Sequence, residues 1–590
     1  MNENDINPIN LEDWEIAELA ESKMQKIEDI IDKIDIKDDE WILKGDGIAK
    51  LKAQTLWNRV KDNEIGKYID VTAITPTPLG EGKTTTTIGL VEGLAKLGKK
   101  SMGAIRQPSG GPTFNIKGSA AGGGKAQCIP LTPFALGLTG DIDAITNAHN
   151  LCMVALTARM QHENNYDDER LKKIGISRLD IDPEQIQIKW AIDFCAQALR
   201  NITIGKGGKM DGLEMNSGFQ ISVSSELMAI LAIAEDLKDM RKRISQMVVA
   251  SSRNGKEITT ADLEVDGAMA ALMLDTFNPT IVQTLEGNPI LVHAGPFANI
   301  AIGQNSVISD KIGIRLSEYL VTESGFGADI GYEKFWNLKC RYSGLKPDAV
   351  VIVATVRALK MHGGGPEVKP GKQLDDAYIK EDLDLLEKGC SNLIAHINTV
   401  VKSGSKPVVC INSFNTDTST EHALIKKIAE ENGASCAVSE HWLKGGEGSK
   451  ELAQLVINAA EEPNDFEFLY ENDISIRERV IKIATEIYGA DGVDWSQKAE
   501  DKLSFYEKDA QTSKLGICMV KTHLSLSHDP ILKGKPSGWV LPIRDILVYR
   551  GAGFIVPVSG DIKLMPGTGS NPGFRKIDID PSSGKVTGLF

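Results

Sequence analysis

The sequence lacks the patterns that mark a membrane-spanning, disulfide-rich or zinc-binding protein. Its longest uninterrupted apolar stretch is Leu227–Ala234, far short of the roughly 18 residues that a membrane-spanning helix requires. None of its eight cysteines forms a CxxC pair, and its nine histidines include no HExxH motif. We therefore expect buried free thiols rather than disulfides or a structural metal. The stretch MNENDINPINLEDWE has neither a basic start nor an apolar run, which predicts no secretory signal and a cytoplasmic protein.

The sequence also has too few basic residues for a general nucleic-acid binder. Lys and Arg number 66 against 81 Asp and Glu, giving a formal net charge of −15. Such an acidic chain disfavours nonspecific binding to nucleic acids or anionic membranes, although a local basic pocket can still hold a small anion. We therefore expect small-molecule substrates, with neither nucleic acid nor membrane as a partner.

What the sequence does contain is an alternation of β-rich runs and helical patterns along its 590 residues. A chain of this length suits about three to five units of packing. Residues 1–65 have mostly amphipathic helical spacing, whereas the later segments alternate. The expected strands are Tyr68–Ile74, Met102–Ile105, Met247–Ala250, Pro289–His293, Tyr319–Thr322, Ala349–Val356, Pro407–Asn412 and Ala434–Val438. This order predicts an α/β fold with a mostly parallel sheet.

The strongest chemical signal is the run GEGKT at residues 80–84, between an expected strand and a helical segment. Nucleotide phosphates need inward-pointing backbone N–H groups, a lysine, a hydroxyl for Mg²⁺ and a helix N-terminus behind the loop. Thr77 stands where the usual pattern has its first glycine, so this is a variant phosphate loop (P-loop); a plain strand–helix turn is the alternative. The expected ATP-binding residues are Thr75, Thr77, Pro78, Gly80, Glu81, Gly82, Lys83, Thr84 and Thr85, with Thr84 also holding the metal.

Gly-rich or polar clusters follow most of the expected strands. They read GEGKT, RQPSGGP, AGPFAN, ESGFGADIG, TVRALKMHGG, NSFNTDT and SEHWLKGGEG. Ligands of open α/β sheets bind beyond the carboxyl ends of the strands, so seven such clusters predict one site assembled from many loops. Arg106, at the end of the second strand, could hold a carboxylate or acyl phosphate by paired hydrogen bonds, a surface salt bridge being the alternative.

Eight ordered blocks resemble the formate–tetrahydrofolate ligase (10-formyltetrahydrofolate synthetase) family. They are TPTPLGEGKTTTT, RQPSGGPTFNIKGSAAGGG, LTGDIDAITNAHNL, GPFANIA, TESGFGADIGYEKF, VIVATVRALKMHGG, SEHWLKGGEG and CMVKTHLSLSHDP. The resemblance implies ATP-dependent ligation of formate to tetrahydrofolate, giving 10-formyltetrahydrofolate, ADP and phosphate through formyl phosphate. It also implies a role in one-carbon metabolism and a homo-oligomer, a tetramer in bacterial members.

By this resemblance the catalytic residues are Lys83, Arg106 and Asp141. Lys83 would bind the outer phosphates of ATP, and Arg106 would hold formate and formyl phosphate. Asp141, in LTGDIDA, would orient the folate or the substrate; a helix N-cap is the reading that composition alone favours. Positioning and charge stabilisation should carry most of the rate.

Three aromatic residues in strand-end loops would form the folate site: Phe297, Phe414 and Trp442. Aromatic faces suit a flat, polar-edged pterin, whereas core packing is the alternative for an isolated aromatic. Lys444 and residues 445–448 could line the same pocket, and a strand-end carboxylate such as Asp329 could reach the metal through water. Arg357, Lys360 and His362 belong to the matched motif without an assigned step.

Some positions depart from the family pattern. Gln107 replaces a glutamate linked to monovalent-cation activation, so we expect weak or altered dependence on potassium or ammonium. Ser119, Lys125 and Ile302 also differ from the usual residues. These changes motivate one alternative, a paralogue with altered substrate or lost activity. A second alternative is a partner-regulated P-loop ATPase, which would turn over ATP without formate and would not need the aromatic loops.

The expected division of the chain has three parts. Residues 1–375 would form a large P-loop domain that binds nucleotide and formate. Residues 376–495 would form a second α/β domain that contributes folate-site loops. Short strands with turns begin at Leu515, so residues 496–590 would form a small, β-rich C-terminal α+β domain.

Overall fold

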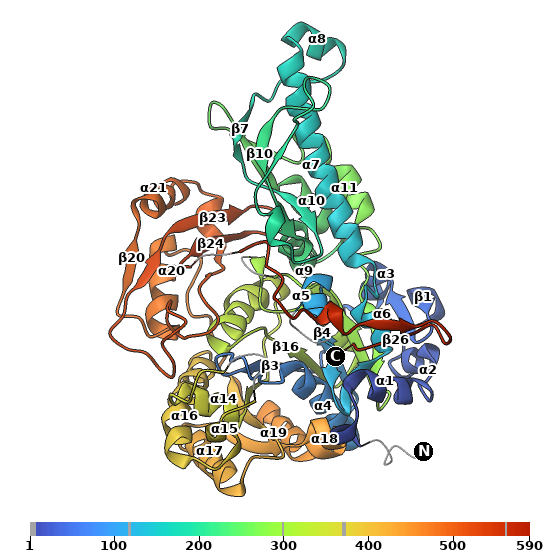
Figure 1. The fold of residues 1–590 in the computed structure, drawn as a ribbon, viewed down its shortest axis with the longest axis vertical. Coiled ribbons are helices and arrows are strands. Elements are labelled where there is room, and N and C mark those ends of the chain that lie inside the picture. The colour runs from blue at the N-terminus through green and yellow to red at the C-terminus, as the bar shows by residue number, and fades with distance from the viewer. Residues whose placement is uncertain (1–6, 116–119, 298–299, 369–372, 561–562, 590) are drawn as a thin grey trace.

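The computed structural model describes residues 7–115, 120–297, 300–368, 373–560 and 563–589. Within them, a 12-stranded sheet runs through the middle of the molecule (Figure 1). Its strand order is β1 (Trp41–Gly45), β2 (Ile48–Leu51), β14 (Thr280–Thr284), β15 (Pro289–Val292), β4 (Ser101–Ile105), β16 (Tyr319–Glu323), β3 (Lys67–Ala73), β17 (Ala349–Ala354), β18 (Lys406–Asn412) and β19 (Ser435–Ser439), with β6 (Ala126–Ile129) beside β14 and β5 (Gly122–Gly123) beside β6. All strands from β15 to β19 pair in parallel. The predicted α/β class with a large, mostly parallel sheet is therefore confirmed.

Strand residues alternate between two apolar layers. In β3, Ile69 packs with α4 (Lys83–Lys96) and α19 (Lys450–Glu461), whereas Tyr68 points into the opposite layer with α12 (Val307–Leu316). Because helices cover both faces, a central strand such as β17 is buried along its whole length and reads as the continuous apolar run AVVIVA. The carboxyl ends of these strands remain as the edge where polar loops gather.

The N-terminal region contains a hairpin that the sequence reading missed. Helices α1 (Asp13–Glu21), α2 (Ile27–Lys33) and α3 (Ala53–Val60) form, but β1 and β2 lie between α2 and α3 and extend the sheet through β14. The expectation of mostly helix over residues 1–65 is therefore partly wrong. The GDG turn was the available signal, since Gly45 and Gly47 both have positive φ there.

Residues 141–277 form a projecting unit, seen at the top of Figure 1. Its longest helix, α7 (Asp141–Asn165), leads away from the sheet toward α8 (Asp168–Lys173). The expected strand at 247–250 forms as β12 (Val248–Ser252), but it pairs antiparallel with β7 (Ile181–Ile186) and β13 (Glu257–Thr259). It therefore belongs to a small separate sheet.

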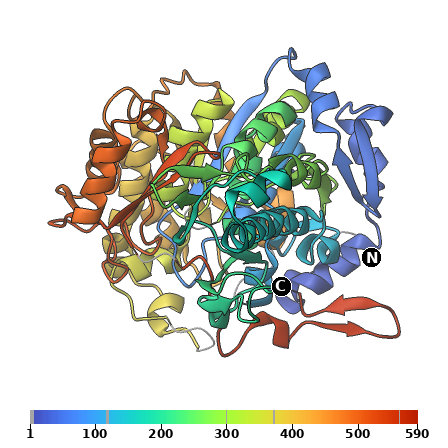
Figure 2. The same cartoon turned by 90° about the horizontal axis from the view of Figure 1, so that it is seen from above.

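The C-terminal region contains the expected short strands. They are β20 (Val493–Trp495), β21 (Gly516–Ile517), β22 (Leu541–Ile543), β23 (Asp545–Tyr549), β24 (Phe554–Val558), β25 (Asp578–Asp580) and β26 (Lys585–Thr587). Figure 2 shows the last hairpin, β25–β26, extending along one side of the molecule, and Lys585 pairs there with Glu18 of α1. The main sheet continues from β17 to β18 across residue 375, and the division into three domains stays a prediction.

The sequence predicted free thiols rather than disulfides, and no membrane-spanning helix. All eight cysteines are free, and seven of them are buried, with Cys195 partly exposed. The expectation of buried free thiols is confirmed for seven cysteines, and Cys195 is the exception. In the described ranges, no helix combines the length and the apolar character needed to cross a bilayer.

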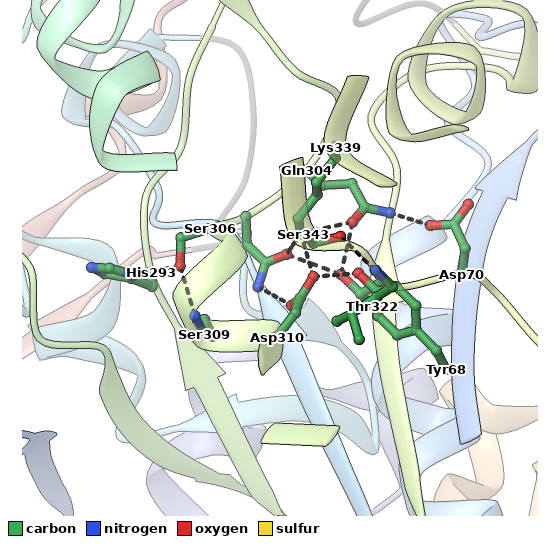
Figure 3. A network of polar contacts seen from close by, with 12 residues as sticks. Tyr68, Asp70, His293, Gln304, Ser306, Ser309, Asp310, Thr322, Lys339 and Ser343 are labelled. Carbon is green, nitrogen blue, oxygen red and sulfur yellow. Dashed lines mark hydrogen bonds and ion pairs between the residues drawn. The ribbon is translucent and has the colours of Figure 1, made fainter. Parts of the chain in front are cut away.

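A fully buried polar network lies on the face of the sheet opposite α4 (Figure 3). Lys339 forms an ion pair with Asp310, which also accepts a hydrogen bond from the Tyr68 hydroxyl. The Lys339 ammonium further donates to Gln304 Oε1 at 2.9 Å and to Asn305 Oδ1 at 2.8 Å. Since these groups satisfy one another out of contact with solvent, the network fixes the loop at 304–305 against β3 and β16.

Lys339→Met should destabilise the fold strongly, because it leaves Asp310 as an uncompensated buried charge, at a cost of about 3–5 kcal/mol. Adding Asp310→Asn should recover part of the loss in the thermal unfolding midpoint. Lys380→Met is the matched control: its pair with Asp376 is exposed, so losing it should barely change the unfolding midpoint. Equal midpoints for Lys339→Met and Lys380→Met would contradict this account of the network.

Candidate functional site

The predicted phosphate loop links β3 to α4. Gly80 and Gly82 both adopt positive φ, +73° and +77°, and a Cβ on Gly82 would lie 2.4 Å from Asn412 Nδ2. Gly82 is the N-cap of α4 and supplies no side-chain cap, so the first N–H groups of this 14-residue helix are available for an anion. Pro78 and Gly80 are exposed at the loop, and Thr85 is half-buried in the first turn of α4.

Glu81 braces the loop from within. Its Oε1 accepts hydrogen bonds from the Thr77 backbone N–H at 2.7 Å and from the Thr77 hydroxyl at 3.2 Å. Its other carboxylate oxygen lies 3.8 Å from Lys83 Nζ, and its backbone carbonyl accepts from Asn412 Nδ2 at 3.1 Å. Thr77 stands where the usual pattern has glycine. Its hydroxyl therefore adds a hydrogen bond to Glu81 that a glycine could not make.

The start of the loop is held by side chains from α14 (Val356–His362) and α16 (Leu383–Lys402). His396 Nε2 lies 3.0 Å from the Thr75 hydroxyl, and Asn392 bonds both the Thr75 N–H and its hydroxyl. His362 Nε2 lies 2.8 Å from the Thr75 carbonyl. Thr75, expected among the ATP-binding residues, is buried and fully occupied by these contacts.

A carboxylate that the sequence reading did not name joins two residues that it did. Glu323 Oε2 accepts a hydrogen bond from the Thr84 hydroxyl at 2.7 Å, and Glu323 Oε1 lies 3.7 Å from Arg106 Nη2. The geometry follows from the sheet order, because β16, which ends at Glu323, lies between β4 and β3. Its position in the TESGFGADIG cluster was the signal that could have identified it.

Arg106 retains donors for a further anion. Its guanidinium is too far from Glu323 for a hydrogen bond, and its buried Nε has no hydrogen-bond partner among the described residues. A Cβ on Gly325 would lie 2.8 Å from Arg106 Nη1, so glycine is needed there for the guanidinium to fit. The arrangement can hold a small carboxylate or a phosphate oxygen.

Thr84 and Glu323 together fit the protein side of a Mg²⁺–nucleotide site. Hydroxyl and carboxylate oxygens are the ligands that Mg²⁺ prefers, and the ion usually takes few protein ligands beside phosphates and water. In the described part of the chain, no group of three or more His, Cys, Asp or Glu residues could hold a metal by itself. Asp329 instead forms a buried ion pair with Lys521 at 2.7 Å.

Asp141 is the first residue of α7, after the N-cap Gly140. Its buried Oδ1 accepts from Lys50 Nζ of β2 at 2.6 Å. Burial raises the pKa of Asp141 to about 6 even though Lys50 lowers it. Lys50 belongs to β2, which lies five places from β3 in the sheet order. The described partner of Asp141 is therefore distant from the phosphate loop in the sheet order, and the catalytic role of Asp141 stays a prediction.

Two of the predicted folate aromatics follow adjacent strands, β18 and β19. Trp442 is 37% exposed, its carbonyl accepts from the Lys125 N–H at 2.9 Å, and its indole lies against Gly124. Phe414 is half-buried, and the Arg357 guanidinium lies over its ring, 4.3 Å from the centroid. Both side chains therefore have described contacts and remain partly exposed.

Phe297 is separated from these rings along the sheet edge. It follows β15, five places from β18 in the sheet order, and it is half-buried against the core with its N–H donating to the Val223 carbonyl. Two cations of the neighbouring motifs have other partners: Lys360 pairs with buried Glu421 at 2.6 Å and Lys444 pairs with Glu440 at 2.5 Å.

Of the positions that depart from the resembled pattern, Gln107 and Ile302 are buried and Lys125 is half-buried. Gln107 is buried and its N–H donates to the Ala294 carbonyl at 2.7 Å, while its side-chain Oε1 has no partner among the described residues. Ile302 packs in the core, and Lys125 lies beside Trp442. Ser119 lies outside the described residues.

Comparison with known proteins identifies the family. A family model described as formate–tetrahydrofolate ligase matches residues 11–590. A formate–tetrahydrofolate ligase of Dehalococcoides mccartyi is 61% identical over 586 residues, covering 99% of this chain and 98% of that protein. Proteins of the same name from Desulforapulum autotrophicum (59% over 589 residues; 99% of this chain and 100% of that protein) and Desulfotalea psychrophila (62% over 557 residues; 94% and 100%) are also similar.

Three buried histidines around the loop should make the fold acid-sensitive. Burial lowers the pKa of His362, His396 and His441 to about 4 each, whereas the unfolded chain binds these protons near pH 6.5. The unfolded state therefore gains protons first as pH falls, and stability is lost between about pH 6.5 and 4, at about 1.4 kcal/mol per histidine per pH unit.

His396→Gln should flatten this dependence, because the amide does not titrate while its nitrogen can still face Thr75. The measurement is the unfolding midpoint at pH 7 and at pH 5 for both proteins. A midpoint difference identical to that of the wild-type protein would show that His396 is not buried in its neutral form.

Proposed function

Because the chain belongs to the formate–tetrahydrofolate ligase family, we propose that its reaction takes place at the strand ends of β4, β16 and β3. The protein is an enzyme that joins formate to tetrahydrofolate with ATP, giving 10-formyltetrahydrofolate for one-carbon metabolism. The observation that carries the location is the Thr84–Glu323–Arg106 contact. One oxygen of the Glu323 carboxylate contacts Thr84 of the nucleotide loop, and the other lies near the Arg106 guanidinium, which can bind a carboxylate.

The chemistry requires that proximity. Formate resists attack because its carboxylate is negatively charged and has no leaving group. In the proposed route a formate oxygen attacks the γ-phosphorus, the bond to the β-phosphate oxygen breaks, and ADP and formyl phosphate form. The N10 amine of the folate then attacks the formyl carbon, the C–O bond to phosphate breaks, and the amine proton leaves. Such steps depend mainly on positioning and charge stabilisation.

Each side chain has a role that its surroundings support. Lys83 and the uncapped N-terminus of α4 would bind the transferring phosphates. Arg106 would hold formate and then formyl phosphate through its unpartnered Nε and its η nitrogens. Thr84 and Glu323 would hold Mg²⁺, which when bound supplies positive charge against the phosphate oxygens.

The folate would lie at the neighbouring ends of β18 and β19. Phe414 and Trp442 would contact the pterin, with Arg357 fixing Phe414 from behind. Asp141 and Phe297 remain proposed site residues on resemblance alone, and the homotetramer has the same basis. Neither the inactive paralogue nor the partner-regulated ATPase is favoured by a specific observation.

Lys83→Ala should lower kcat by about 100-fold or more, because it removes the cation nearest the outer phosphates. ADP release is measured with and without formate and tetrahydrofolate, and in the wild-type enzyme it should require both. Lys427→Ala, an exposed lysine of α17 (Ser419–Glu431), is the control and should retain activity. ADP release independent of formate would reject the ligase, and no ADP under any condition would favour the paralogue.

Potassium or ammonium should activate this enzyme weakly, because the neutral Gln107 side chain cannot balance a cation as a carboxylate does. The measurement is the initial rate over a titration of each salt at constant ionic strength, for the wild type and for Gln107→Glu. We expect the variant to gain cation dependence. Strong activation of the wild type would show that the cation site does not need a carboxylate at this position.

A further inference from the structure

We propose that Glu323 is an internal competitor of formate, so that formate and the Mg²⁺–nucleotide raise each other's affinity. Without nucleotide, the Glu323 carboxylate neutralises Arg106. When the nucleotide and its metal bind at Thr84, Glu323 turns toward them and Arg106 becomes available. The inference rests on the proposed function, in which Arg106 holds formate and the loop at 75–85 holds the nucleotide.

The first support is chemical identity. Formate and the Glu323 side chain present the same carboxylate group to the same guanidinium. Glu323 Oε1 lies 3.7 Å from Arg106 Nη2, within ion-pair distance but beyond hydrogen-bond distance, and the buried Arg106 Nε has no partner among the described residues. Arg106 is therefore charge-compensated but not hydrogen-bonded by Glu323, and a carboxylate that bonds it directly gains more than it displaces.

The second support is the other end of the same carboxylate. Glu323 Oε2 holds the only proton of the Thr84 hydroxyl, at 2.7 Å, which leaves the oxygen lone pairs of Thr84 free for a cation. A divalent ion at Thr84 attracts Glu323 more strongly than the single charge of Arg106 does. Because one carboxylate serves both cationic sites, occupation of one changes the charge balance at the other.

The third support is that the backbone on both sides of Glu323 is held in place, so a change of partner involves its side chain alone. The residues before and after Glu323 are fixed on the opposite face. The Thr322 hydroxyl, in the network of Figure 3, donates to Asn305 at 3.0 Å, and the Ser324 hydroxyl donates to Asp70 at 2.8 Å. The Gly325 N–H also donates to the Gly303 carbonyl at 2.7 Å. The strand end therefore stays in place while the carboxylate changes partner.

The test is equilibrium binding of isotope-labelled formate to the full-length enzyme, with and without a nonhydrolysable ATP analogue and Mg²⁺. In the wild type, the nucleotide should tighten formate binding at least about fivefold. In Glu323→Gln, formate should bind without nucleotide more tightly than in the wild type, and the nucleotide should add little. Glu323→Asp, whose shorter side chain cannot span both partners, should lose the coupling too and serves if the Gln variant does not fold.

Two controls separate the possible failures. Glu40→Gln changes another buried glutamate paired with an arginine, Arg59, outside the site and should keep the wild-type coupling. Arg106→Ala should lose formate binding under both conditions; unchanged binding would overturn the proposed function itself. If Arg106→Ala loses formate while Glu323→Gln keeps the wild-type coupling, the competition by Glu323 is overturned and the site assignment stands.

Discussion

The proposed site depends on one buried carboxylate that contacts both the start of α4 and the Arg106 guanidinium. Glu323 accepts a hydrogen bond from Thr84 at the start of α4 and pairs with Arg106 beyond β4. It can do so because β16 lies between β3 and β4, so that three parallel strands deliver the nucleotide loop, the carboxylate and the guanidinium to the same edge. Removing any of these strands from the order would separate the groups that make up the proposed site.

This arrangement also explains how an acidic protein handles anionic substrates. The chain carries a formal net charge of −15, which repels anions at long range, but the interaction falls off within about 10 Å in ordinary salt. At the site itself, Lys83, Arg106 and the uncapped N-terminus of α4 supply local positive charge. The carboxylates of Glu81 and Glu323 lie within ion-pair distance of Lys83 and Arg106, respectively.

Local sequence signals predicted the parts of the site, but not their contacts. Gly80 and Gly82 indicated the loop because glycine adopts the positive φ found there at the least steric cost. Glu323 was missed because the expected strand ended at Thr322, one residue early, and because the order β4–β16–β3 pairs segments more than 200 residues apart. The hairpin β1–β2 was read as helix because β2 pairs with β14, a partner far along the chain that local patterns do not reveal. Asp329, read as a metal-site carboxylate, is committed to Lys521 from the C-terminal region.

The most direct measurement is a crystal structure of the enzyme with formate, Mg²⁺ and a nonhydrolysable ATP analogue. The account predicts the nucleotide phosphates on the loop at 77–84, formate hydrogen-bonded to Arg106, and the Glu323 carboxylate turned from Arg106 toward the metal or its bound water. Formate bound away from Arg106, or Glu323 still paired with Arg106 while both ligands are present, would contradict the account.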